Sequence, residues 1–169
     1  MKKLFLSCAL VCAVFGQDVE RLKSECAAKN GQSCEILGNI LYQNGDTKGA
    51  VNAAKAACEL LGGYENTGSC DMVNSILVQS GEIDAAIAWH EMRCDAGIMR
   101  DCGSLGLLHK FHGAEQKYED KAKAILSAAC EAKNPEACFA YADFFDGDEW
   151  EKYKQLACDL DNYFCLGGE

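Results

Sequence analysis

The sequence predicts an all-α protein, a solenoid of about four αα-hairpins joined by disulfides, and three observations support this prediction. Ten cysteines form five couples, and the couples recur every 28 to 36 residues, a period typical of stacked helical hairpins. Alanine is abundant, only one proline occurs, and β-branched residues are few and scattered, so strand signals are lacking. Helix breakers lie within most of the couples, as a turn between two helices requires. The couples are Cys26–Cys34, Cys58–Cys70, Cys94–Cys102, Cys130–Cys138 and Cys158–Cys165.

Each couple is predicted to be a disulfide between the end of one helix and the start of the next. On one straight helix Cys26 and Cys34 would lie about 12 Å apart, whereas a disulfide needs Cα atoms within about 7 Å. The chain must therefore turn between them. Ten cysteines allow roughly 900 connectivities, and the periodicity selects the sequential pairing. A zinc framework is disfavoured because no Cys-x-x-Cys motif occurs and histidines do not accompany the couples.

The N-terminus predicts a secretory signal peptide over residues 1–16. Lys2 and Lys3 precede an apolar stretch, residues 4–15, which is too short to anchor the chain across a bilayer. Small residues near Gly16 suit cleavage before Gln17. We therefore expect a secreted or periplasmic protein, whose oxidising surroundings suit disulfides. A lipoprotein signal is the weaker alternative, because the residues before Cys8 and Cys12 match a lipidation box poorly.

The charge of the chain limits its partners. The formal net charge is −10, and it becomes −12 when Lys2 and Lys3 leave with the signal. Nucleic acid and anionic membrane surfaces would repel such a chain. We expect a neutral or basic partner, no nucleic acid, no membrane insertion of the mature form, and a monomer.

Alignment on the second cysteine of each couple places the helices in order. An N-terminal cap helix is predicted within residues 17–30. The first, or A, helices cover 32–44, 68–80, 99–112 and 135–146, and a glycine follows each at the place of a helix C-cap. The second, or B, helices cover 47–60, 82–96, 115–132 and 148–160. The mature chain, 17–169, thus divides into repeats at about 31–63, 64–97, 98–134 and 135–162, with a truncated cap at 163–169.

One stretch of the sequence resembles a known family. Residues 34–45, Cys-Glu-Ile-Leu-Gly-Asn-Ile-Leu-Tyr-Gln-Asn-Gly, followed by Lys48-Gly49-Ala50 and the run ending at Cys58, look like a Sel1-like repeat. The version with a disulfide between hairpins resembles the cysteine-rich proteins of Helicobacter and its relatives. The chain departs from the usual repeat because its loops between A and B helices are cut short, as at residues 44–46.

The resemblance implies a right-handed superhelix whose concave face is lined by A helices. It also implies an alternative function, because some members of the family are described as penicillin-binding proteins or slow β-lactamases. The residues do not supply that chemistry: Ser-x-x-Lys, Ser-Asp-Asn and Lys-Thr-Gly elements are all missing from the sequence. Weak β-lactam hydrolysis, a reaction on a cyclic amide, is therefore an alternative that only the resemblance supports.

Other candidate chemistry is sparse, and no cofactor or metal is expected. His109 and His112 lie three positions apart and could share a helix face, but only His90 could join them. The acidic run around Gly147 does not match a calcium loop, and its first residues, Asp148 and Glu149, suit a helix N-terminus. We interpret both groups as structural.

A binding surface is the better hypothesis. In hairpin solenoids, the A-helix residues that point away from the B helices line the inner face. Here that face is polar, rich in amides and mostly acidic, which suits an extended peptide, a protein or a peptidoglycan fragment. We therefore predict a noncatalytic interaction module that binds through these residues, although a merely solvated face fits the pattern equally well. The predicted residues are Glu35, Asn39, Gln43, Asp71, Ser75, Gln79, Arg100, Leu107, Lys110, Phe139 and Asp143.

Overall fold

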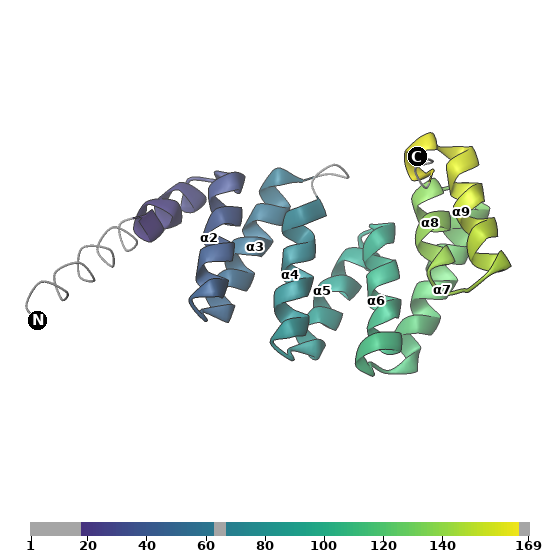
Figure 1. Ribbon diagram of the computed structural model, residues 1–169, viewed down its shortest axis with the longest axis horizontal. Helices are drawn as coiled ribbons and strands as arrows, with labels where there is room; N and C mark the ends of the chain where they lie inside the picture. Colours follow the sequence, from purple (N-terminus) through teal and green to yellow (C-terminus); the bar gives the residue numbers. More distant parts are fainter. Residues whose placement is uncertain (1–17, 63–66, 166–169) are drawn as a thin grey trace, which may run out of the picture. The chain divides into compact units, whose positions relative to one another are not determined.

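The computed structural model describes residues 18–62 and 67–165 (Figure 1). The predicted signal peptide, part of the loop between Cys58 and Cys70, and the end of the predicted C-terminal cap lie outside the described residues. The chain divides into two compact units, one up to Glu82 and one from Ile83. The boundary falls inside the second predicted hairpin, between its A and its B helix.

The described residues form an all-α protein of sequential hairpins, as predicted. The first unit holds a helix over residues 18–27, whose described part begins at Asp18. It is followed by α2 (Gly31–Gln43), α3 (Thr47–Leu61) and α4 (Thr67–Gln79). The second unit holds α5 (Ile83–Asp95), α6 (Met99–His112), α7 (Gln116–Glu131), α8 (Pro135–Ala142), α9 (Asp148–Leu160) and the short 3-10 helix η1 (Asn162–Phe164).

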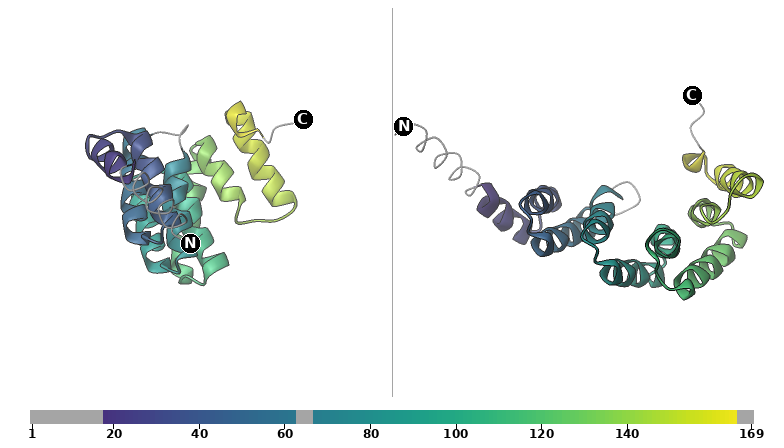
Figure 2. Two further views of the ribbon diagram at one scale, coloured as in Figure 1. Left: turned by 60° about the vertical axis from the view of Figure 1, so that its left-hand side comes forward. Right: turned by 60° about the horizontal axis from the view of Figure 1, so that its bottom comes forward.

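Successive helices pack against each other within each unit. In the first unit α3 contacts both α2 and α4, and in the second α7 contacts both α6 and α8 (Figure 2). In the second unit the A helices α6 and α8 also contact each other. None of the helices that the structure describes has the length and apolar character needed to cross a bilayer.

All five predicted disulfides are present. Their Cα atoms lie 4.4 to 4.8 Å apart, so the chain does turn back within each couple. Each bridge joins the end of one helix to the start of the next, or, for Cys158–Cys165, to the residue after η1. Five disulfides indicate that the protein folds in an oxidising compartment outside the cytoplasm.

The turns beside the disulfides share one local design. The residue three positions after the first cysteine adopts a left-handed backbone in Lys29, Gly97 and Lys133, with φ of 65°, 86° and 64°. At two of these turns an asparagine follows: the side chains of Asn30 and Asn134 accept hydrogen bonds from backbone N–H groups of the next helix. The left-handed residue ends one helix and the asparagine caps the next, which brings the two cysteines together.

One predicted helix is too long. The sequence predicts a helix over 135–146, but α8 ends at Ala142. Beyond it the backbone N–H groups of Phe144 and Phe145 bond to carbonyls three residues back, as in a turn. The buried ammonium of Lys154 approaches the end of α8, where it donates to the carbonyl of Phe139 at 3.0 Å and to Asp143 at 2.7 Å. A cation at a helix C-terminus stabilises that end.

Candidate functional site: the A-helix faces and the groove beside the first hairpin

The predicted binding residues of the first unit lie on two neighbouring A helices. Spacing of four residues places each set on one face of its helix, α2 or α4. A hydrogen bond joins the two helices at this level, because the hydroxyl of Tyr42 donates to Gln79 Oε1 at 2.7 Å. All but one of the six side chains are exposed, and Glu35 is half-buried. The six are Glu35, Asn39, Gln43, Asp71, Ser75 and Gln79.

The predicted residues of the second unit have mixed roles. Arg100 and Lys110 are exposed on α6, and Leu107 is half-buried between them. Phe139 and Asp143 instead hold the fold together: the Lys154 ammonium lies 3.3 Å from the centre of the Phe139 ring and pairs with Asp143 at 2.7 Å. Lys154 is buried, so these two contacts provide partners for its charge.

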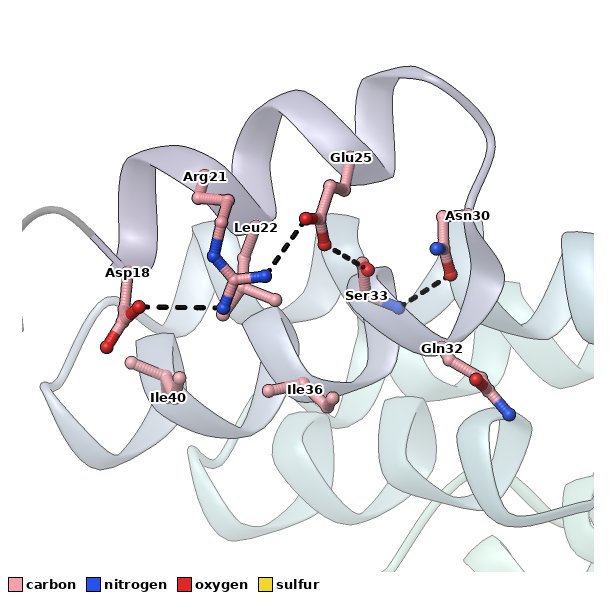
Figure 3. Close-up of a pocket in the computed structure, with 9 residues that line it drawn as sticks. All are labelled: Asp18, Arg21, Leu22, Glu25, Asn30, Gln32, Ser33, Ile36 and Ile40. Carbon is pink, nitrogen blue, oxygen red and sulfur yellow. Dashed lines mark hydrogen bonds and ion pairs between the residues drawn. The ribbon is translucent and has the colours of Figure 1, made fainter.

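A groove of about 330 Å³ lies along the seam between helix 18–27 and α2 (Figure 3). Its floor is apolar, formed by Leu22 from the first helix and by Ile36 and Ile40 from α2. Its rim is polar. The rim residues are Asp18, Arg21, Glu25, Asn30 and Gln32, and the buried Ser33 also lines the groove.

The charged rim of the groove is internally paired. Arg21 reaches Glu25 at 2.9 Å and Asp18 at 3.5 Å, and the Ser33 hydroxyl donates to Glu25 at 2.7 Å. The hydrogen bond from Ser33, and then that from Arg21, lower the pKa of Glu25. The hydrogen bond to Glu25 raises the pKa of Arg21. Two carboxylates share one guanidinium, so the rim carries a net negative charge.

The sequence prediction missed this groove. Ile36 is 51% exposed, which is unusual for an isoleucine within a hairpin. One feature of the sequence could have predicted the groove. Ile36 and Ile40 form an apolar pair one turn apart on α2. This pair lies about 100° around the helix from the polar pair Glu35 and Asn39. Ile40 is half-buried: it borders the groove and also packs against the core cluster of Leu22, Leu37 and Ala53.

The sequence prediction also missed a buried polar cluster in the second unit. His90 Nδ1 lies 2.7 Å from Asp101 Oδ1, and Arg93 Nε donates to Asp101 Oδ2 at 2.9 Å. Asp101 is adjacent to Cys102, while His90 and Arg93 precede Cys94, so the cluster lies beside the disulfide of this junction. His90 and Asp101 are both buried, which assigns the cluster to the interior rather than to an accessible site.

The remaining histidines do not assemble a metal site in the part of the chain that the structure describes. There, no group of three or more His, Cys, Asp or Glu side chains is placed to hold a metal ion. His109 Nδ1 bonds to the carbonyl of Ala114 and its Nε2 lies 3.8 Å from Glu119, while His112 is exposed at the end of α6.

No protein-family model matches this chain, and a search of curated proteins finds no match. The likeness to cysteine-rich Sel1-like repeats therefore rests on the chain itself, and its paired helices and five bridges between successive helices are consistent with such repeats.

Proposed function

We propose that this chain is a noncatalytic interaction module, exported to the periplasm or the cell exterior, that binds a peptide, a protein or a cell-wall fragment on its A-helix faces. One observation carries the proposal. In the first unit, two adjacent A helices present amide, hydroxyl and carboxylate groups to solvent from backbones fixed by disulfides. Side chains such as Asn39, Ser75 and Gln43 offer donors and acceptors to an extended ligand.

The stapled hairpins favour binding because they reduce its entropic cost. A surface that is already ordered loses little conformational freedom when a ligand docks. A stack of hairpins has no large central core, and short bridged loops add about 2.5 kcal/mol each to its stability in the loop-entropy model. The cysteine-rich Sel1-like resemblance supports the same assignment. β-Lactam hydrolysis is not proposed, because no observation on the described residues favours it.

Capture of a partner from periplasmic, envelope and host-surface extracts tests the proposal. The bait is the oxidised chain, and the test variant is Asn39→Arg, which places a bulky cation on the exposed face of α2. The matched control is Asn52→Arg, because Asn52 is equally an exposed asparagine but lies on the B helix α3. We expect a partner that Asn39→Arg loses and Asn52→Arg retains. A partner that both variants retain would contradict binding on the A-helix face.

A further inference from the structure

Within the first unit, the A helix α2 packs closely against the two helices that follow it, α3 and α4, and a glycine of α2 lies at the contact. A Cβ atom built on Gly38 of α2 would come 3.0 Å from the terminal methyl of Met72, and 3.4 Å from backbone atoms of Ala50 and Ala54. Ala50 and Ala54 lie eight and four positions before Cys58, and Met72 lies two positions after Cys70. The contact therefore leaves little room for a side chain at position 38.

The second unit repeats this arrangement. A Cβ on Gly106 of α6, four positions after its cysteine like Gly38, would meet the ring of Phe144 first and would come 2.9 Å from Cβ of Ala122 in α7. One turn earlier, a Cβ on Gly103 would meet Cβ of Ala140 in α8 at 3.2 Å. Ala122 lies eight positions before Cys130 and Ala140 two positions after Cys138. Two of the three positions around Gly38, eight before the first cysteine and two after the second, thus also lie against an A-helix glycine in the second unit.

The groove of the first hairpin is lined by the same three positions. Asp18 and Leu22 lie eight and four positions before Cys26, Ile36 lies two positions after Cys34, and all three border the groove. Among the described residues no A helix precedes helix 18–27. Ile36 is consequently 51% exposed, whereas Met72 is half-buried and Ala140 is buried at the equivalent place.

We propose that this groove binds a single α-helix of a partner protein, seated as α2 is on α3 and α4. The partner helix presents a glycine or alanine toward Ile36, because the chain's own seats contact glycine. It carries a lysine or arginine near Asp18, since a carboxylate stands there in place of Ala50 and Ala122. Arg21 reaches Asp18 only at 3.5 Å because it also pairs with Glu25, and the chain as a whole has a net charge of −10. The binding mode is a helix in a groove.

This surface is distinct from the polar A-helix faces of the proposed function. Ile36 and Ile40 contribute an apolar floor, while Asn39 and Ser75 offer only polar contacts. The groove therefore selects a folded helix, and the polar faces suit an extended ligand.

A stapled peptide derived from α2 tests the proposal. The probe has the sequence of residues 31–43 with Cys34→Ala and Glu35→Gln, so that it carries no free thiol and no side-chain charge. A covalent staple joins positions 36 and 40, which lie about 180° from Gly38 around the helix, because so short a peptide is only marginally helical in water. Fluorescence anisotropy of the labelled peptide against the oxidised chain measures the affinity. A second peptide with Gly38→Leu is the control for the glycine contact.

We expect saturable binding of the glycine peptide, weakened at least about tenfold by Gly38→Leu in the peptide and by Ile36→Lys in the chain. Met92→Lys is the matched chain variant, because Met92 is an apolar residue of similar exposure, 57%, on α5, and it should leave binding unchanged. Equal binding of the two peptides, equal binding by the Ile36→Lys chain, or no saturation by any chain would overturn the proposal. So would sedimentation that shows a dimer abolished by Ile36→Lys without peptide binding, which would assign the groove to a second copy.

Discussion

Two junctions between helices, one in each unit, are closed by equivalent disulfides but differ in the side chains buried beside the disulfide. Where α3 meets α4, the residues four and one positions before the first cysteine are Ala54 and Ala57, and the residue before the second cysteine is Ser69. Where α5 meets α6, the same places hold His90, Arg93 and Asp101, joined by an ion pair and a hydrogen bond. The Cα atoms of the two bridges are nevertheless 4.8 and 4.6 Å apart.

The comparison teaches that the disulfide and the turn fix the backbone, while the side chains beneath them vary. The position four residues before the first cysteine is buried in all five cases, whatever its chemistry: Leu22, Ala54, His90, Leu126 and Lys154. In the second unit two of these are charged or titratable, and each has a carboxylate partner. Buried polar groups need such partners, so the two kinds of junction should respond differently to substitution.

The largest expected effect is loss of the carboxylate at the polar junction. Asp101→Ala removes the carboxylate that pairs with the buried His90 and the mostly buried Arg93, and should lower the free energy of unfolding by about 3 kcal/mol. Ser69→Ala, at the equivalent buried place, should cost less than about 1 kcal/mol. Urea unfolding of the oxidised variants measures both. Equal losses at the two sites would remove the distinction between the junctions.

The bridges themselves should contribute almost equally. Replacing both cysteines of Cys94–Cys102 by alanine should cost about 2.5 kcal/mol, and of Cys58–Cys70 slightly more, because the loop is somewhat longer. Chemical denaturation of the two double variants tests this expectation. A difference above about 1.5 kcal/mol between the two losses would show that the buried side chains beside a disulfide change how much that disulfide stabilises the fold.

Replacing the polar side chains of one junction by the apolar side chains of another tests the comparison further. The junction of α7 and α8 holds Leu126, Ala129 and Ala137 at the same places. The triple variant His90→Leu, Arg93→Ala and Asp101→Ala gives the polar junction this apolar set. Because no buried charge is left unpaired, we expect it to lose only about 1 kcal/mol, less than Asp101→Ala alone. A triple variant less stable than the single one would show that the polar cluster is required for the fold.

The smallest expected effect is the pH dependence of the stability that the hydrogen bonds to Glu25 give the first hairpin. Hydrogen bonds from Ser33 and then Arg21 lower the pKa of Glu25 in the folded state. Stability from this contact is therefore present above the carboxyl pKa of the unfolded chain, about 4.3. It is lost as the pH falls through the lower folded-state pKa.

Ser33→Ala should thus lower Tm at pH 7, with a difference from the parent chain that shrinks below about pH 4. Thermal unfolding followed by circular dichroism measures the difference at each pH. Ser75→Ala, at an exposed serine of α4, is the control and should show no such trend. A Ser33→Ala effect that stays constant from pH 7 to pH 3 would contradict the assignment.

Local features of the sequence predicted the fold well, because they depend on residues close in the chain. The cysteine spacing, the breakers within the couples and the glycines after the A helices placed nearly every helix within a residue or two. The end of α8 was missed, and there Lys154, which comes from another helix, donates to the carbonyl of Phe139. The right-handed superhelix stays a prediction.

The candidate sites were harder to predict from the sequence than the fold. Exposed polar positions such as Asn39 and Ser75 follow from helical register, but nothing local shows that Asp143 is taken up by Lys154. The groove depends on which helices precede α2, and the pairing of His90 with Asp101 depends on a turn of the backbone. Each of these features becomes visible only when equivalent positions of the repeats are compared in three dimensions.

The most direct test of the central claim, that the chain is a binding module that uses its A helices, is hydrogen exchange on the oxidised chain with and without its captured partner. We predict that protection increases in peptides from α2 and α4, over residues 31–43 and 67–79. Failure to capture any partner, or protection confined to the B helices α3, α7 and α9, would contradict the claim.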